Sequence, residues 1–197
     1  MFFFVLFLTT SSFSEIPKTN LQRFQQGICE ITNAVLREPY LQNRDTIIVY
    51  IDSSQYSWFI EHGITKALLE KGVYTKLSSI NSISPSPMIE VHPSELTTQY
   101  SEPFRKSIWG TRYITRKINI SMFVTCSIPN SIQFNAEKKW SEIDTVQWDE
   151  VQTIESPLIN FTVGTKTNSS WFDTYMEPFV VIGTTAVTIF LFFTVRS

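Results

Sequence analysis

The clearest chemical feature of this sequence is a group of cations within residues 105–117. The group consists of Arg105, Lys106, Arg112, Arg116 and Lys117. Cations gathered on one surface could bind anionic lipid headgroups, a polyanion or an acidic partner. The same side chains could instead form the solvated edge of a strand pair, where lysine also discourages pairing with other chains. Residues 105–117 are therefore a candidate anionic-partner patch, with a solvated edge as the alternative.

The other polar side chains form no catalytic or metal-binding pattern. His62 and His92 each lack Cys, His or carboxylate neighbours at the spacing of zinc ligands. The sequence has no G-x-S-x-G, P-loop or G-x-G-x-x-G motif. Asp52, Ser53 and Ser54 follow an expected strand, where α/β sheets often bind ligands, but helix capping explains them equally well. We predict no catalytic, metal-binding or cofactor-binding residue, no cofactor and no small-molecule substrate, while an enzyme of an unrecognised type stays open.

The two cysteines, Cys29 and Cys126, lie far apart in the sequence and match no metal or redox spacing. Free cysteine behaves as a small buried apolar side chain, so two separate buried thiols are one expectation. Outside the cytoplasm the pair could instead form one disulfide. The sequence leaves both arrangements open.

Length and charge limit the classes of protein to which this chain can belong. The 197 residues are enough for one domain of usual size plus terminal extensions. The formal net charge is −2, so no overall positive field attracts nucleic acid, and we predict no nucleic-acid partner. Charged residues make up 17%, below the about 25% of soluble domains, in part because both ends of the chain are apolar.

The apolar C-terminal end predicts a minimal transmembrane helix. The 17 residues from Phe179 to Val195 carry no charge. As a helix they would rise about 26 Å, against a hydrocarbon core of about 30 Å. Arg196 beyond them favours a cytoplasmic C-terminus. We therefore predict a transmembrane helix and short tail over residues 173–197, bound to the lipid bilayer. Aromatic residues just before the apolar run are candidates for the membrane interface: Trp171, Phe172 and Tyr175.

The N-terminal end is also apolar. Residues 2–8 carry no charge but are too few to span a bilayer. Ser12 and Ser14, just before Glu15, resemble a signal-peptide cleavage site, although the positive start typical of signal peptides is missing. Residues 1–14 are therefore expected to be a signal-like or membrane-dipping segment. With the predicted C-terminal topology, this places residues 15–172 outside the cytoplasm, in the periplasm if the chain is bacterial.

The first half of residues 15–172 predicts helices alternating with strands. Apolar residues recur at helical spacing in two segments, and β-branched residues are concentrated in two others. The expected order is helix 19–37, strand 46–51, helix 55–71 and strand 73–77. Thr19 or Asn20 is expected to cap the first helix, and Gly72 to end the second. Strand, helix and strand at this length indicate a βαβ-type unit.

The second half predicts antiparallel strands. Residues 111–127 alternate apolar and polar side chains, and residues 131–135 can return beside them as a hairpin. Shorter strands are expected at 89–91, 96–100 and 158–163, while 143–154 fits helix and strand equally. The predicted fold class is therefore α+β, a mixed sheet with a βαβ-type unit, an antiparallel hairpin and helices on one face.

Residues 46–77, with the later phrases "ISMFVTCS" and "SIQFNAEKKW", resemble the α+β domain of bacterial envelope proteins of the CsgG and TolB N-terminal type. In that type a strand leads to a helix that ends in Gly, and a later hairpin carries a phrase that ends in Trp. This chain departs from the lipoprotein members because it has no lipobox Cys near its N-terminus and has an expected C-terminal span instead. The resemblance implies an assembly or scaffold role in an envelope complex and transfers no site residue.

Two functions follow as expectations. The first is a non-catalytic, membrane-anchored structural or accessory subunit of a larger membrane or cell-envelope complex, whose extracytoplasmic domain contacts other subunits. The second is a membrane-anchored binding module that uses the patch of residues 105–117 for anionic lipid or a polyanion.

Overall fold

The computed structural model describes residues 16–42, 44–77, 86–107, 110–128, 131–166 and 171–194. The strands are β1 (Thr46–Ile51), β2 (Tyr74–Leu77), β3 (Met88–Tyr100), β4 (Phe104–Arg105), β5 (Arg112–Ile128), β6 (Ser131–Gln147) and β7 (Thr165–Lys166). The helices are α1 (Asn20–Leu36), α2 (Ser57–Glu70), α3 (Val151–Ile154) and α4 (Trp171–Thr194), with 3-10 turns η1 (Trp148–Glu150) and η2 (Asn160–Thr162).

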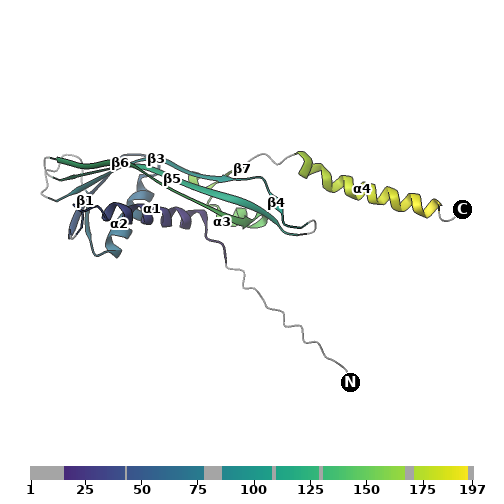
Figure 1. Cartoon of the computed structure of the whole chain (residues 1–197), viewed down its shortest axis with the longest axis horizontal. Coiled ribbons are helices and arrows are strands. Elements are labelled where there is room, and N and C mark those ends of the chain that lie inside the picture. The colour runs from purple at the N-terminus through teal and green to yellow at the C-terminus, as the bar shows by residue number, and fades with distance from the viewer. Residues whose placement is uncertain are drawn as a thin grey trace, which may run out of the picture.

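These elements form a two-layer α+β fold, with one mixed sheet above the helices α1 and α2 (Figure 1). The main strands follow the order β2, β1, β3, β5, β6, while β4 pairs with β5 and β7 pairs with β3. β1 is parallel to both β2 and β3, whereas β5 is antiparallel to β3 and β6. The predicted class, a mixed sheet with helices on one face, is confirmed.

Local signals set the boundaries of the first helix. Thr19 Oγ1 accepts a hydrogen bond from the Gln22 N–H at 3.2 Å, and Gln22 Oε1 accepts one from the Thr19 N–H at 2.9 Å. This capping box satisfies backbone donors that the helix cannot pair internally. The expected apolar stripe behind it is buried, from Phe24 to Val35. The predicted helix over 19–37 is confirmed, and of the two expected caps, Thr19 and Asn20, Thr19 is the N-cap.

The βαβ-type unit is also confirmed. β1 covers the predicted residues 46–51, and α2 connects it to the parallel strand β2. Gly72 follows α2 with a φ of 74°, a left-handed conformation that favours glycine over residues with a Cβ. The expected capping of α2 by the Asp52–Ser54 triplet does not occur, because Tyr56 is its N-cap and makes no side-chain capping bond.

The antiparallel half is longer than predicted. β5 and β6 are 17 residues each and stay paired from Tyr113–Gln147 to Ile128–Ser131. β6 therefore continues far beyond the expected 131–135 and includes the first part of 143–154, the rest of which forms η1 and α3. Alternate side chains of β6 have polar partners on α1 or just after it, which a local pattern does not reveal.

The structure corrects two other strand predictions. The expected short strands 89–91 and 96–100 are one strand, β3, interrupted by a bulge between Pro93 and Glu95. Proline lacks the N–H that a regular ladder needs, so an irregularity at Pro93 is expected physically. The predicted strand 158–163 is wrong, since its residues form η2 instead.

The two faces of the sheet differ in composition. Even-numbered side chains of β5 face α1 and α2 in the core, and Ile118, Ile120, Met122 and Val124 are each at most 2% exposed. We call this the closed face. Odd-numbered side chains of β5 point to the other side, on which none of the described helices packs. We call this second side the open face.

The predicted transmembrane helix is the largest correction. α4 contains 24 residues, but among the described residues no helix is both long enough and apolar enough to cross a membrane. The predicted span from Phe179 to Val195 is therefore wrong, and the cytoplasmic C-terminus inferred from it has no support. The signal-like residues 1–14 lie outside the described ranges.

Candidate functional site

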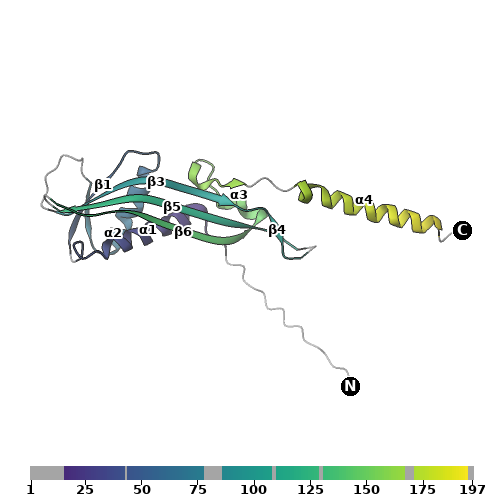
Figure 2. The same cartoon turned by 45° about the horizontal axis from the view of Figure 1, so that its top comes forward.

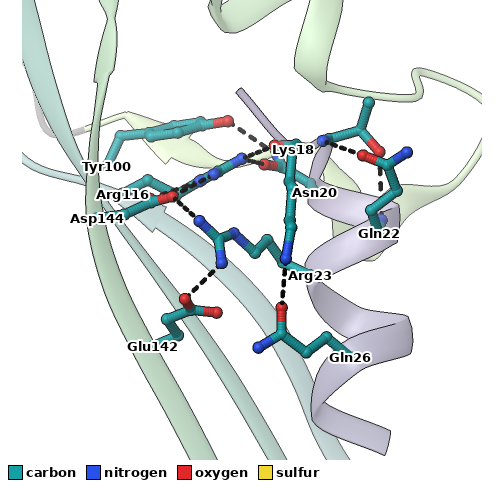
Figure 3. Close-up of polar contacts among 10 residues, drawn as sticks. Lys18, Asn20, Gln22, Arg23, Gln26, Tyr100, Arg116, Glu142 and Asp144 are labelled. Atoms are coloured by element: carbon teal, nitrogen blue, oxygen red, sulfur yellow. Dashed lines mark hydrogen bonds and ion pairs between the residues drawn. The ribbon is translucent and has the colours of Figure 1, made fainter. Parts of the chain in front are cut away.

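A buried polar cluster joins the start of α1 to the closed face of the sheet (Figure 3). At its centre is Arg116 of β5, whose side chain is 1% exposed. Its Nε and Nη2 donate to the two carboxylate oxygens of Asp144 on β6, with 2.8 Å between Nε and Oδ1. Its Nη1 donates to the Lys18 carbonyl at 2.8 Å and to Asn20 Oδ1 at 2.7 Å. One guanidinium thus binds both strands and the chain that enters α1.

Arg23 and Asn20 extend this cluster from the first turns of α1. Arg23 donates to Glu142 and, at 2.9 Å, to Asp144 Oδ2. Asn20 Nδ2 donates to Tyr100 Oη at 2.9 Å and to a backbone carbonyl of η2 at 2.6 Å. Two guanidinium groups therefore face two carboxylates, so the buried charges balance.

The electrostatics of the cluster favour a structural role. Burial raises the pKa of Asp144, but hydrogen bonds and charges from Arg116 and Arg23 outweigh this effect, so the pKa is lowered from its usual value. Burial raises the pKa of Tyr100 to about 12. At neutral pH the carboxylate is charged and the phenol is neutral, and both are hydrogen-bonded. The arrangement is suited to fastening α1 to the sheet.

The structure divides the predicted anionic-partner patch. Three of its cations gather where β4 pairs with the start of β5: Arg105, Lys106 and Arg112. Arg116 belongs to the buried cluster instead, and Lys117 lies on the open face, opposite Ile143 of β6. A surface of five cations is therefore absent from the described chain. An anionic partner for the three that gather stays a prediction.

The open face carries linked polar side chains. Ser121 is 7% exposed; it accepts a hydrogen bond from Ser94 Oγ at 3.0 Å and donates one to Glu137 Oε1 at 2.7 Å. Beside it, Asn119 Oδ1 accepts a hydrogen bond from Ser141 Oγ at 2.9 Å. Two apolar side chains of this face remain exposed, by 45% and 64%: Phe123 and Ile143. Aromatic side chains such as that of Phe123 are enriched in protein interfaces relative to the rest of the surface.

His92 on β3 lies near two carboxylates, one on its own strand and one just after the neighbouring strand β1. Its Nδ1 lies 3.4 Å from Asp52 Oδ2, and its Nε2 lies 3.7 Å from Glu90 Oε1. All three side chains are partly exposed. Across the described ranges, no three His, Cys, Asp or Glu side chains are placed to hold a metal ion.

The remaining candidate residues are the cysteines and the aromatic residues before position 179. Both cysteines are free thiols, with Cys126 buried in the core and Cys29 half-buried on α1. Burial raises the pKa of Cys126 to about 11. Trp171, Phe172 and Tyr175 belong to α4, but their side chains lie outside the described part of the chain.

One sequence signal could have placed Arg116 correctly. It shares the even parity of Ile114, Ile118 and Ile120, so strand alternation puts it on the buried face. No comparable signal exists for its neighbours. In the same cluster Arg23 meets Glu142 across 119 residues of sequence, and no spacing rule links residues so far apart.

Comparison with known proteins reveals no family. No family model and no curated protein matches the sequence. Among solved structures, the chain is similar to rare lipoprotein B from Shewanella oneidensis, at 7% identity and a TM-score of 0.35, over 73% of this chain and 98% of that one. It is also similar to a minor lipoprotein from Acinetobacter baumannii, at 10% identity and a TM-score of 0.35, over 60% and 84%. Lipoprotein GNA1162 from Neisseria meningitidis matches at 12% identity and a TM-score of 0.29, over 72% and 97%. Likenesses this low carry no functional argument, and the resemblance to the CsgG and TolB type stays a prediction.

Proposed function

We propose that this protein is a non-catalytic accessory subunit of a larger cell-envelope assembly and that it acts through protein–protein contacts of its sheet. The observation that carries this proposal is the open face. It combines a hydrogen-bonded polar network around Ser121 with exposed Phe123 and Ile143. Exposed aromatic residues such as Phe123 support an interface, because aromatic residues are enriched there. The signal-like character of residues 2–8 supports the envelope location.

Purification from the source cells tests the proposal. The tagged full chain is isolated in mild detergent, and the size and composition of the particle are measured. The double variant Phe123→Glu/Ile143→Lys changes only exposed side chains of the open face. Leu69→Glu is the matched control, because Leu69 is 55% exposed but belongs to α2. We expect the wild type and the control to retain other subunits and the double variant to lose them. A wild-type monomer without partners, or an unaffected double variant, overturns the proposal.

A second candidate function rests on the three cations gathered beside β4. Their proximity favours binding of an anionic lipid surface. Co-sedimentation with vesicles of anionic lipid at low and high salt tests it, because exposed charge pairs are screened by salt. Arg105→Glu/Arg112→Glu should abolish a salt-sensitive binding that Lys117→Glu, on the open face, leaves intact. This candidate function is contradicted if vesicle binding is unchanged by high salt or by the double charge reversal.

A further inference from the structure

β6 is an edge strand along its whole length. It pairs with β5 from Ser131 to Gln147, and among the described residues no strand pairs with its other side. Figure 2 shows β3, β5 and β6 side by side, with β6 outermost. Proteins usually shorten, bulge, cover or charge a long edge because its free N–H and C=O groups can pair with another strand. β6 carries charges of both signs, so a partner strand must place opposite charges against each other. At 17 residues, this edge offers an extended pairing surface.

Hydrogen bonds of β5 reveal which residues of β6 direct their backbone outward. The Thr115 carbonyl accepts from the Ser101 N–H at 2.9 Å, and the Thr115 N–H donates to Ser101 Oγ at 3.1 Å, so odd-numbered residues of β5 bond toward β3. Alternate residues of an antiparallel strand bond to opposite sides. Even-numbered residues of β5 therefore bond to β6, and their register partners there are also even-numbered. The odd-numbered residues of β6 direct N–H and C=O outward: Asn135, Glu137, Lys139, Ser141, Ile143 and Thr145.

We propose that a second copy of this chain pairs antiparallel with the outer edge of β6, about a two-fold axis at Trp140. This inference rests on the proposed function and names one of its partners. Odd-numbered residues then bond to odd-numbered residues of the copy, as the outward backbone groups require. The paired region extends from position 133 to position 147 and is its own complement, as a two-fold interface must be.

Charge complementarity supports this position of the axis. Lys138 lies opposite Glu142 of the copy, once on each side of the axis, and Lys139 lies opposite Ser141 of the copy. Axes at positions 137, 138, 139 or 142 would set a charged side chain against its own equivalent, which destabilises a strand pair. An axis at Ser141 avoids like charges but shortens the paired region. The axis at Trp140 therefore gives the longest pairing with opposite charges joined.

The position of α1 leaves space for the copy. A Cβ on Gly27 would lie 2.5 Å from Ile120 Cδ1 and 2.5 Å from Trp140 Cε3, and these two residues are register partners. α1 therefore crosses above the line between β5 and β6 at the level of Trp140. With strands about 4.8 Å apart, the two α1 helices would lie roughly 10 Å apart, close to the 8–10 Å of packed helices.

A proline substitution tests the use of this edge. In the full chain in mild detergent, molar mass is measured by light scattering over a range of concentrations. Ser141→Pro removes an outward N–H while sparing the ladder with β5, and Ser141→Ala is its matched control. We expect wild type and Ser141→Ala to form dimers with the same Kd, and Ser141→Pro to raise that Kd at least tenfold. A monomeric wild type, or dimers that Ser141→Pro leaves intact, overturns the inference.

Cross-linking tests the register. Lys139→Cys and Ser141→Cys chains are mixed, each also carrying Cys29→Ser. Directly opposed residues have Cα atoms about 5.5 Å apart, within disulfide range. We expect disulfide-linked dimers of the Lys139→Cys and Ser141→Cys chains, and no such dimers when Leu69→Cys on α2 replaces either of them. If Lys139→Cys and Ser141→Cys do not cross-link, the register is overturned. A wild-type chain that retains other subunits but does not dimerise would contradict only this inference. A wild-type chain that dimerises but retains no other subunit would contradict only the proposed function.

Discussion

Arg116 and Lys117 are neighbours in the sequence, yet they lie on the two different faces of β5. Arg116 is 1% exposed on the closed face, and its guanidinium is held by Asp144, Lys18 and Asn20. Lys117 is exposed on the open face. A buried charge must be fully paired because water cannot solvate it, whereas an exposed charge is solvated wherever it points. The closed face therefore depends on complete pairing of its buried charge, whereas the open face places no such demand on Lys117.

Removing the buried guanidinium should lower the free energy of unfolding far more than removing a charge from the open face, and this is the largest difference we expect between the two faces. Arg116→Met keeps the aliphatic stem but leaves Asp144 without its main partner, and breaking a buried ion pair costs about 3–5 kcal/mol. Lys117→Met, its sequence neighbour, should change the free energy of unfolding by less than about 0.5 kcal/mol. Urea unfolding of both variants measures the contrast. Equal losses would show that the closed face does not depend on this cluster.

The second-largest difference between the two faces should be in how their stability depends on pH. The pKa of Asp144 is lowered in the folded protein, so its contribution to stability is present above the unfolded pKa of about 3.9 and disappears as pH falls through the lower folded value. Urea unfolding from neutral pH to about pH 2.5 should show this loss in the wild type.

Asp144→Asn should flatten that acid dependence. Glu137→Gln on the open face is the control. Hydrogen bonds from Lys139 and Ser121 lower the pKa of Glu137 too, but the side chain is solvated. High salt should therefore suppress the effect of Glu137 and spare that of Asp144. An unchanged acid dependence in Asp144→Asn would contradict this account.

Disturbing the close contact between α1 and the sheet should lower the free energy of unfolding by an intermediate amount. Gly27→Ala introduces a Cβ that meets Ile120 and Trp140 at 2.5 Å, and such overpacking costs about 1–3 kcal/mol. Helix propensity alone would stabilise the variant by about 1 kcal/mol, so the net loss should be about 0–2 kcal/mol. Ala34→Gly at an exposed position of the same helix measures the propensity term by itself. A stabilised Gly27→Ala would mean that α1 shifts freely on the sheet.

The polar network of the open face should matter least. Ser121→Ala removes the hydroxyl between Ser94 and Glu137, but both partners can rebind water. We expect a loss below about 1 kcal/mol in urea unfolding. A loss as large as that of Arg116→Met would place this network among the structural elements of the fold rather than on a contact surface.

Local patterns were sufficient for the first half of the domain. The stripe of α1, the Thr19 cap, β1 and the left-handed Gly72 each depend on residues within a few positions of one another. The second half was predicted less well. β6 alternates charged residues with few apolar ones, so its length becomes visible only beside β5 and α1. The predicted span from Phe179 to Val195 is wrong, because none of the described helices is both long enough and apolar enough to cross a membrane.

By itself, the sequence determined the α+β class, the βαβ-type unit and the buried alternation of β5, because short-range periodicity encodes which side of an element is apolar. Only the tertiary structure decided the rest. It placed Arg116 in a buried ion pair rather than in the predicted surface patch, it brought Asp52 close to His92, and it paired none of the described strands with the outer edge of β6. These outcomes depend on contacts between residues far apart in the chain, and such contacts are set by which strands pair and in what register.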